Sequence, residues 1–265
     1  MNGISIAYER AGDGPALVLL HGFLFDSRAW RPQLEELSKD FTVIAWDAPG
    51  AGRSPDPPEP FAIADWADCL AAVLDAAGVR SAAHLVGLSW GGLLAQELYR
   101  RHPARVRSLV LADTYAGWRG SLPAAVVEER LAACVRDSSL APAEVVARYL
   151  PGMHSESAAP DVRAEMAAIM ADFHPAGFRL MASALATSDT RELLATIRVP
   201  TLLVWGQADA RSPLHAGEAM QALIPRARLE VIPETGHVSN LEAPERFSAI
   251  VRGFCLSCQD AVSRR

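Results

Sequence analysis

The chain has 265 residues, with 25 basic and 31 acidic side chains and a formal net charge of −6 at pH 7. Half of the residues are hydrophobic and 21% are charged, a composition that excludes intrinsic disorder. No basic run suits a phosphate backbone, so nucleic acid is excluded as a partner. The longest apolar runs have about five residues against the roughly 20 of a membrane span, so no membrane partner is expected.

The first ten residues and the cysteines bear on the cellular compartment. Residues 1–10 lack the basic start and apolar core of a secretory signal, so we expect a cytoplasmic protein. The four cysteines, Cys69, Cys134, Cys255 and Cys258, are too few and too scattered for a disulfide framework. The last two have the spacing of a redox or zinc pair, but no second pair and no nearby histidine accompany them. We therefore expect free thiols and no metal site.

Short apolar, β-branched runs alternate with helical patterns along the chain. This alternation predicts an α/β fold with a mostly parallel sheet and helices on both faces. Strands are predicted at residues 4–8, 16–20, 42–45, 84–87, 108–112, 201–205 and 229–232. Helices are predicted at residues 30–37, 63–77, 91–101, 214–223 and 243–255.

One connection is too long for this alternation. The stretch from Thr114 to Arg198 has roughly 55 residues more than the about 30 that a crossover with its helix requires. Its own helical patterns fall at residues 124–134, 142–150, 162–173 and 178–185. We therefore predict a core domain of residues 1–116 and 190–265, interrupted by a helical cap, or lid, of residues 117–189.

A loop rich in glycine and proline follows the third predicted strand. Its Gly50 and Gly52 resemble the start of a dinucleotide-binding fingerprint. The third glycine position is Pro55, however, and no helix opens on the glycines. The loop is therefore predicted to be a tight turn whose glycines adopt conformations that other residues avoid.

The five residues from Gly87 to Gly91 match the pattern G-x-S-x-G around Ser89. The run before them is strand-like and the run after them is helical, so Ser89 is predicted to lie on a strand-to-helix turn. Flanking glycines permit the strained backbone that such a turn requires. A serine in this position is a candidate nucleophile.

A serine hydroxyl at neutral pH needs a base to remove its proton, so the motif predicts a partner histidine. His237 follows the last predicted strand and precedes the last helix, which places it at the carboxyl edge of the sheet. His21 heads a glycine loop and is favoured as structural, and His84 begins a strand and is expected in the core. The others, expected to be solvated or part of the lid, are His102, His154, His174 and His215.

The base needs a carboxylate to fix its tautomer and stabilise the imidazolium. Asp209 follows the penultimate strand and is the favoured acid, giving the order Ser89, Asp209, His237. Asp113 follows the strand 108–112 and satisfies the same order. It remains a competitor, although its side chain can equally hold the first turn of the lid.

Acyl transfer places negative charge on the carbonyl oxygen, which requires preorganised donors. The backbone N–H of Trp90, directly after the nucleophile, is one candidate. The loop after the second strand supplies another through the N–H of Phe23. Because these donors are backbone groups, the two aromatic side chains are expected to line the acyl pocket.

Together these motifs resemble the α/β-hydrolase family over almost the whole chain. The matching pieces lie at residues 21–23, 47–54, 87–92, 206–209 and 236–237. The run of residues 236–247, with a lid that begins near Asp113 and Trp118, is most similar to 3-oxoadipate enol-lactone hydrolases and related small carboxylesterases. The resemblance implies hydrolysis of a modest ester or lactone.

The resemblance also carries implications for the substrate and for rival chemistries. Those enol-lactonases accept a carboxylated substrate, which requires a cation, and Arg119, Arg148 and Arg179 are candidates in the lid. Perhydrolases, carbon–carbon bond hydrolases and a vitamin-K-pathway lyase share the motifs. Haloalkane dehalogenases and epoxide hydrolases are excluded, because they place an aspartate where this chain has Ser89.

The sequence thus predicts a serine hydrolase of small esters or lactones that works through Ser89, His237 and Asp209 without a cofactor. Substrate-binding residues are expected at Leu24, Trp118, Met153 and Val238. The alternatives are a carbon–carbon bond hydrolase or lyase with the same three residues, and a ligand receptor with negligible turnover. The partner in every case is a small molecule.

Overall fold

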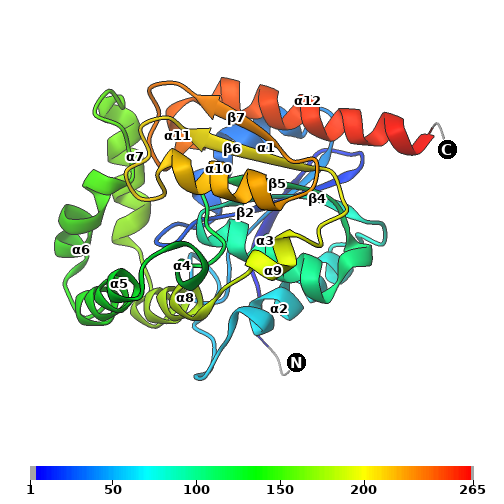
Figure 1. Ribbon diagram of the computed structural model, residues 1–265. Helices are drawn as coiled ribbons and strands as arrows, with labels where there is room; N and C mark the ends of the chain where they lie inside the picture. The colour runs from blue at the N-terminus through cyan, green and yellow to red at the C-terminus, as the bar shows by residue number, and fades with distance from the viewer. Residues whose placement is uncertain (1–3, 264–265) are drawn as a thin grey trace.

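A seven-stranded sheet forms the centre of the computed structural model, which describes residues 4–263 (Figure 1). The spatial order is β1-β3-β2-β4-β5-β6-β7, and β1 is antiparallel while the other pairings are parallel. The strands are β1 (Tyr8–Ala11), β2 (Ala16–Leu20), β3 (Thr42–Trp46), β4 (Ala83–Leu88), β5 (Val106–Ala112), β6 (Thr201–Gly206) and β7 (Arg228–Ile232). The predicted α/β fold is confirmed.

Burial explains why most strands could be read from the sequence. Every residue of β2, β3, β4 and β6 is buried, as continuous apolar runs in a parallel sheet predict. The prediction for the first strand is wrong, because β1 begins at Tyr8 rather than running over residues 4–8. Tyr8 pairs with Trp46, the last residue of β3, so the residues before it have no neighbouring strand left to pair with.

Helices cover both faces of the sheet (Figure 1). α1 (Arg31–Leu37) and α12 (Pro244–Ser263) pack together on one face. α2 (Ile63–Ala76), α3 (Trp90–Arg101) and α10 (Leu214–Leu223) lie on the other face. Short turns of helix precede α1 and α12 at η1 (Ser27–Trp30) and α11 (Ser239–Glu242), and η2 (Pro103–Arg105) precedes β5. No helix in the described part of the chain is long and apolar enough to span a membrane.

The connection between β5 and β6 is helical and gathers at one end of the sheet (Figure 1). We call residues 118–194 the helical segment. It contains α4 (Trp118–Ser121), α5 (Ala124–Asp137), α6 (Pro142–Tyr149), η3 (Leu150–Gly152), α7 (Pro160–Ala171), α8 (Pro175–Thr187) and α9 (Arg191–Leu194). The four longest of these helices correspond to the four predicted helical patterns.

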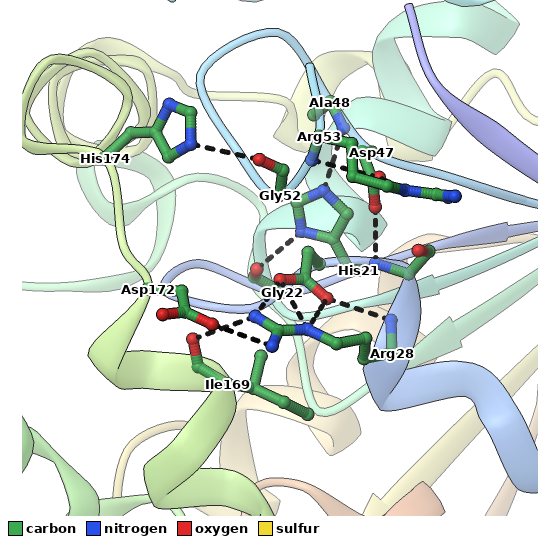
Figure 2. A network of polar contacts seen from close by, with 12 residues as sticks. His21, Gly22, Arg28, Asp47, Ala48, Gly52, Arg53, Ile169, Asp172 and His174 are labelled. Carbon is green, nitrogen blue, oxygen red and sulfur yellow. Dashed lines mark hydrogen bonds and ion pairs between the residues drawn. The ribbon is translucent and has the colours of Figure 1, made fainter. Parts of the chain in front are cut away.

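Polar contacts join the helical segment to the core, as Figure 2 shows. The Arg28 guanidinium donates both to Asp26, 2.7 Å away in the core, and to Asp172 after α7, 2.8 Å away. His174 approaches the Gly52 carbonyl at 3.1 Å and the Asp56 carboxylate at 2.8 Å. Because the Asp172 and Asp56 carboxylates are exposed, the two contacts that they form contribute little stability individually.

The loop of residues 47–58 forms the predicted tight turn. Gly50 and Gly52 both have positive φ, at 84° and 54°. The buried Asp47 carboxylate accepts from the N–H of Ser27 at 2.8 Å and from the Arg53 side chain at 2.9 Å (Figure 2). These hydrogen bonds lower the pKa of Asp47 and fix the start of the turn.

Candidate active site

Ser89 lies at the turn from β4 into α3, with φ 53° and ψ −114°. Its backbone N–H donates to the carbonyl of Ala112 at 2.8 Å, and its carbonyl accepts from the Thr114 hydroxyl at 2.5 Å. A non-glycine residue at positive φ is strained and requires such anchoring contacts. The strand-to-helix turn predicted from the sequence motif is therefore present, and hydrogen bonds to Ala112 in the neighbouring strand β5 and to Thr114 just after it hold it in place.

The glycines of the motif allow a close crossing of three chain segments. A Cβ atom on Gly91 would lie 2.2 Å from the carbonyl oxygen of Leu20, and one on Gly87 would lie 2.3 Å from that of Gly91. No side chain fits at these distances. Both glycines are needed for α3 to start directly beside the end of β2.

His237 lies in the loop after β7 and bridges Ser89 and Asp209. Its Nε2 is 2.9 Å from the Ser89 Oγ, and its Nδ1 is 2.8 Å from Oδ2 of Asp209. Because a carboxylate accepts, Nδ1 carries the proton and Nε2 is free to accept from the serine. The three side chains predicted from chain order therefore form a row in which His237 is within hydrogen-bonding distance of Ser89 on one side and of Asp209 on the other.

The second oxygen of Asp209 anchors its own loop. Oδ1 accepts from the backbone N–H of Arg211 at 2.8 Å and of Ser212 at 2.9 Å. Asp209 and His237 are each only 5% exposed, so the hydrogen bond between them is shielded from water. The carboxylate is thus fixed in the orientation that faces the imidazole.

Asp113, the competing carboxylate, has other partners. Its Oδ1 accepts from the backbone N–H of Gly206 at 2.7 Å and its Oδ2 from the Ser239 hydroxyl at 2.6 Å. Burial and the nearby charge of Asp209 raise its pKa well above the usual value. In this geometry His237 contacts Asp209, and Asp113 joins the end of β6 to α11.

A further carboxylate, Glu242, supports the histidine loop and was not identified from the sequence. It accepts from the N–H of Gly236 at 2.8 Å, directly before His237. It also accepts from the N–H of Ser155 at 3.1 Å and from the Ser155 hydroxyl at 2.5 Å. Glu242 therefore joins the histidine loop to the helical segment, and the Met153 carbonyl adds a bond from the N–H of Val238 at 3.0 Å.

Two backbone N–H groups lie close to Ser89 and remain available as donors. Among the described residues, neither the N–H of Phe23 nor that of Trp90 has a protein acceptor. Trp90 begins α3, where the helix terminus adds positive potential. Phe23 follows Gly22, where an added Cβ would lie 3.5 Å from the Ser89 Cβ. The role of both groups as oxyanion donors stays a prediction.

The aromatic side chains of these two residues differ in environment. The Trp90 indole is completely buried against His21 and Trp66, at centroid distances of 6.1 and 5.3 Å, and its place in an acyl pocket stays a prediction. The Phe23 ring stacks on Phe178 of the helical segment at 4.7 Å. Of the two rings, the Phe23 ring is therefore the one that stacks on an aromatic side chain of the helical segment.

The four predicted substrate-binding residues are all buried but lie in different places. Met153 and Val238 are adjacent to His237 through their shared hydrogen bond. Trp118 lies under the Arg130 guanidinium, 5.7 Å from the ring centre. Leu24 borders a narrow cavity of about 20 Å³ together with residues of α7 and α8. Their role in binding stays a prediction.

His21, His84 and the cysteine pair near the C-terminal end have local explanations. The buried His21 accepts from the Ala48 N–H through Nε2 and contacts the Gly22 carbonyl through Nδ1. Buried His84 contacts Ser108, and burial lowers its pKa to about 4. Cys255 and Cys258 are free, buried thiols. The described residues contain no group of three or more histidine, cysteine, aspartate or glutamate side chains that could hold a metal.

The arginines expected in the lid are paired or exposed. Arg148 forms an ion pair with Asp137, and Arg179 forms one with Glu59 at 3.1 Å. Arg119 is exposed at the surface of α4. None of the three therefore presents an unpartnered charge towards Ser89.

This fold and this arrangement of residues agree with comparisons to known proteins. The model of the alpha/beta hydrolase fold family matches residues 15–244, and the chain belongs to that family. It is an α/β-hydrolase.

Particular relatives extend this result. The chain is 30% identical to 3-oxoadipate enol-lactonase 1 of Acinetobacter baylyi, over 97% of this chain and 94% of that protein. It is 34% identical, over 94% of both chains, to RutD of Azorhizobium caulinodans, for which carbamate hydrolysis is a proposed activity. A thermophilic esterase from Thermogutta terrifontis in its malate-bound structure superposes with a TM-score of 0.90 at 32% identity, covering 96% of this chain and 94% of that one. Relatives of this chain thus include esterases and lactonases.

Proposed function

We propose that this α/β-hydrolase cleaves small carboxylic esters or lactones through an acyl-enzyme on Ser89. The observation that carries the proposal is the continuous contact from the Ser89 hydroxyl through His237 to Asp209, at 2.9 and 2.8 Å. This geometry suits nucleophilic catalysis, in which a base activates the serine and a carboxylate orients the base. Two similar proteins are named as an enol-lactonase and an esterase, which supports cleavage of a carboxylic ester bond.

In the first half of the reaction, the Ser89 Oγ attacks the carbonyl carbon while Nε2 of His237 takes its proton. The oxyanion that forms accepts hydrogen bonds from the N–H groups of Phe23 and Trp90, each worth about 3 kcal/mol in the transition state. Asp209 stabilises the imidazolium. The tetrahedral intermediate then collapses, and His237 gives its proton to the leaving alcohol.

In the second half, water replaces the alcohol. Nε2 of His237 takes a proton from the water as it attacks the acyl carbon. Collapse of the second intermediate breaks the bond to Ser89, which recovers its proton from His237. The products are the carboxylic acid and the regenerated enzyme, and no cofactor enters the cycle.

We further propose that residues 117–189 act as a cap that covers the reacting bond and selects the substrate. Phe178 of α8 packs on Phe23, which carries a proposed oxyanion donor. Ser155 shares the Glu242 carboxylate with the loop of His237. These contacts support a cap that touches both the donor side and the base side of the site.

Hydrolysis of p-nitrophenyl butyrate tests the proposal. Ser89→Ala is expected to lower kcat by at least about 10³-fold, whereas the matched control Ser139→Ala, an exposed serine, retains full activity. Trapping of a butyryl group on Ser89 by mass spectrometry identifies the acyl-enzyme. Equal activity of Ser89→Ala and the unchanged enzyme would contradict the proposal. Ser89-dependent cleavage of a 1,3-diketone without any ester cleavage would assign the same residues to the alternative chemistry.

A further inference from the structure

The strand β7 forms one edge of the sheet and has β6 as its neighbour (Figure 1). At the end of their pairing, the N–H of Gln207 donates to the carbonyl of Ile232 at 3.0 Å. Backbone groups of successive strand residues point to opposite sides, so Ile232 and the residues two and four positions before it face β6. The N–H and C=O groups of Leu229 and Val231 therefore point away from the sheet, and no residue in the range 4–263 binds them.

Apolar side chains border this open edge on the face that α10 covers. Arg228 lies over the Phe254 ring of α12 on the opposite face, so the alternation of the strand directs Leu229 and Val231 towards the α10 face. Both side chains are only half-buried. Leu223, which ends α10 just before the turn into β7, is 37% exposed. Apolar surface beside an unpaired strand edge favours contact with a further strand.

The charged side chains of β7 have no ionic partners within the part of the chain that the structure describes. Arg228 and Glu230 are both exposed, and they lie two residues apart on the α12 face. Charges on an edge strand repel an approaching strand where like charges meet, and unlike charges stabilise the pair. Because β7 carries one charge of each sign, it is able to match a second copy of itself.

The charges favour one register for two antiparallel copies of β7. With Leu229 on the two-fold axis, its outward backbone groups bond to those of Leu229 in the second copy, and each Arg228 faces Glu230 of the other copy. With Arg228 or Glu230 on the axis, that residue faces its own copy and like charges meet. With Val231 on the axis, Glu230 faces an isoleucine and both ion pairs are lost.

We propose that two copies of this chain associate along β7 in the register centred on Leu229, so that their two sheets become one. The contact gives partners to outward backbone groups, covers half-exposed apolar side chains and forms two ion pairs between Arg228 and Glu230. Ser89 follows β4, three strands away from β7 in the sheet, so the interface leaves the proposed reaction centre free. Because a strand of five residues gives a small interface, we expect a dimer with a Kd of about micromolar size.

Sedimentation velocity on the full chain, from about 1 to 200 μM, tests the association. Glu230→Arg places like charges opposite each other at both pairs, and we expect it to raise the Kd at least about tenfold. The double variant Arg228→Glu with Glu230→Arg restores unlike pairs, and its Kd is expected to return to within about 3-fold of the original. The matched control Glu128→Arg makes the same change of charge at an exposed position of α5 and is expected to have no effect.

Disulfide cross-linking tests the register. Residues that face each other in a hydrogen-bonded antiparallel pair have Cα atoms about 5.5 Å apart, which suits a disulfide. Leu229→Cys is therefore expected to yield a covalent dimer under mild oxidation. In Val231→Cys, the matched control at the next outward position, the two cysteines lie four residues out of register, about 13 Å apart, and no cross-link is expected. The four native cysteines are buried, so the unchanged chain is expected to remain uncross-linked.

Three results would overturn the proposal. The first is a monomer over the whole concentration range. The second is a dimer that Glu230→Arg leaves as tight as before, which would place the interface elsewhere on the molecule. The third is cross-linking of Val231→Cys as complete as that of Leu229→Cys, which would exclude the register centred on Leu229.

Discussion

The loops after β5 and β6 each place a buried aspartate at the same edge of the sheet, and only one of them contacts the histidine. Asp209 offers one oxygen to His237 and holds its own loop with the other. Asp113 has both oxygens occupied, by the N–H of Gly206 and the hydroxyl of Ser239. Similar position and identical residue type thus give two different local functions.

The comparison shows that the role of a buried carboxyl group depends on the hydrogen-bond donors around it more than on its position at the edge of the sheet. Asp113 has a pKa well above the usual value, because burial and the charge of Asp209 oppose its ionisation. The Ser239 hydroxyl donates to Oδ2 when Asp113 is ionised; when Oδ2 holds a proton, the hydroxyl can rotate and accept from it, while Oδ1 still accepts from Gly206. An amide has the same pattern of one acceptor and one donor, so the two aspartates are expected to respond differently to the same substitution.

The largest expected effect comes from Asp209→Asn. The amide cannot accept the Nδ1 proton of His237 in the same way, so the imidazole loses the tautomer that activates Ser89. We expect kcat for p-nitrophenyl butyrate to fall by about 10⁴-fold with little change in folding. Asp113→Asn serves as the matched control and is expected to stay within about 5-fold of the unchanged enzyme; the reverse pattern would make Asp113 the acid.

A smaller effect, on stability, is expected from Asp113→Ala. This change leaves the N–H of Gly206 and the hydroxyl of Ser239 without their acceptor in a fully buried place. The free energy of unfolding is expected to fall by about 1–3 kcal/mol in urea titrations, and Asp113→Asn is expected to lose less. If alanine and asparagine destabilise equally, the polar pattern proposed for Asp113 is wrong.

The pH dependence of stability gives a third distinction. Because the folded state raises the pKa of Asp113, it holds this proton more tightly than the unfolded chain. The stabilisation from Asp113 is therefore present below its usual pKa and is lost as pH rises through the folded value. A single group changes the free energy of unfolding by at most about 1.4 kcal/mol per pH unit.

Chemical denaturation at a series of pH values measures this contribution. The difference in stability between the unchanged enzyme and Asp113→Asn is expected to shift in favour of the asparagine variant as pH rises from 4 upward, since the amide has no proton to lose. Parallel pH profiles for the two proteins would contradict a raised pKa at Asp113.

The smallest expected effect comes from Ser239→Ala. Only the donor to Oδ2 of Asp113 is removed, while the bond from Gly206 remains. Thermal unfolding is expected to report a loss of about 1 kcal/mol, with kcat within about 3-fold of the unchanged enzyme. A loss of activity as large as that of Asp209→Asn would show that the two aspartate loops act as one unit.

Residues whose role depends on neighbours in sequence were predictable. The turn at Ser89 follows from Gly87 and Gly91, because the backbone crossing that excludes side chains is encoded within five positions. Strands β2 to β6 follow from continuous apolar runs. The first strand was misplaced because the extent of an edge strand depends on where its partner β3 ends, a property of a distant segment.

Residues whose role depends on distant contacts were harder to assign. Chain order left both Asp113 and Asp209 eligible, since only the position of the Ser239 and His237 side chains separates them. Glu242 and Ser155 lie 87 positions apart, and nothing in either local sequence indicates that they meet.

The Glu242 carboxylate links the position of the histidine loop to that of the helical segment, because it is hydrogen-bonded to both. It holds Gly236 on one side and Ser155 on the other, and an added Cβ on Gly236 would lie 2.5 Å from the nitrogen of Ser155. A chimaera that imports the helical segment from a relative must therefore supply a hydroxyl at position 155 and leave room for the backbone at Gly236. Without both, exchange of the segment also displaces the base.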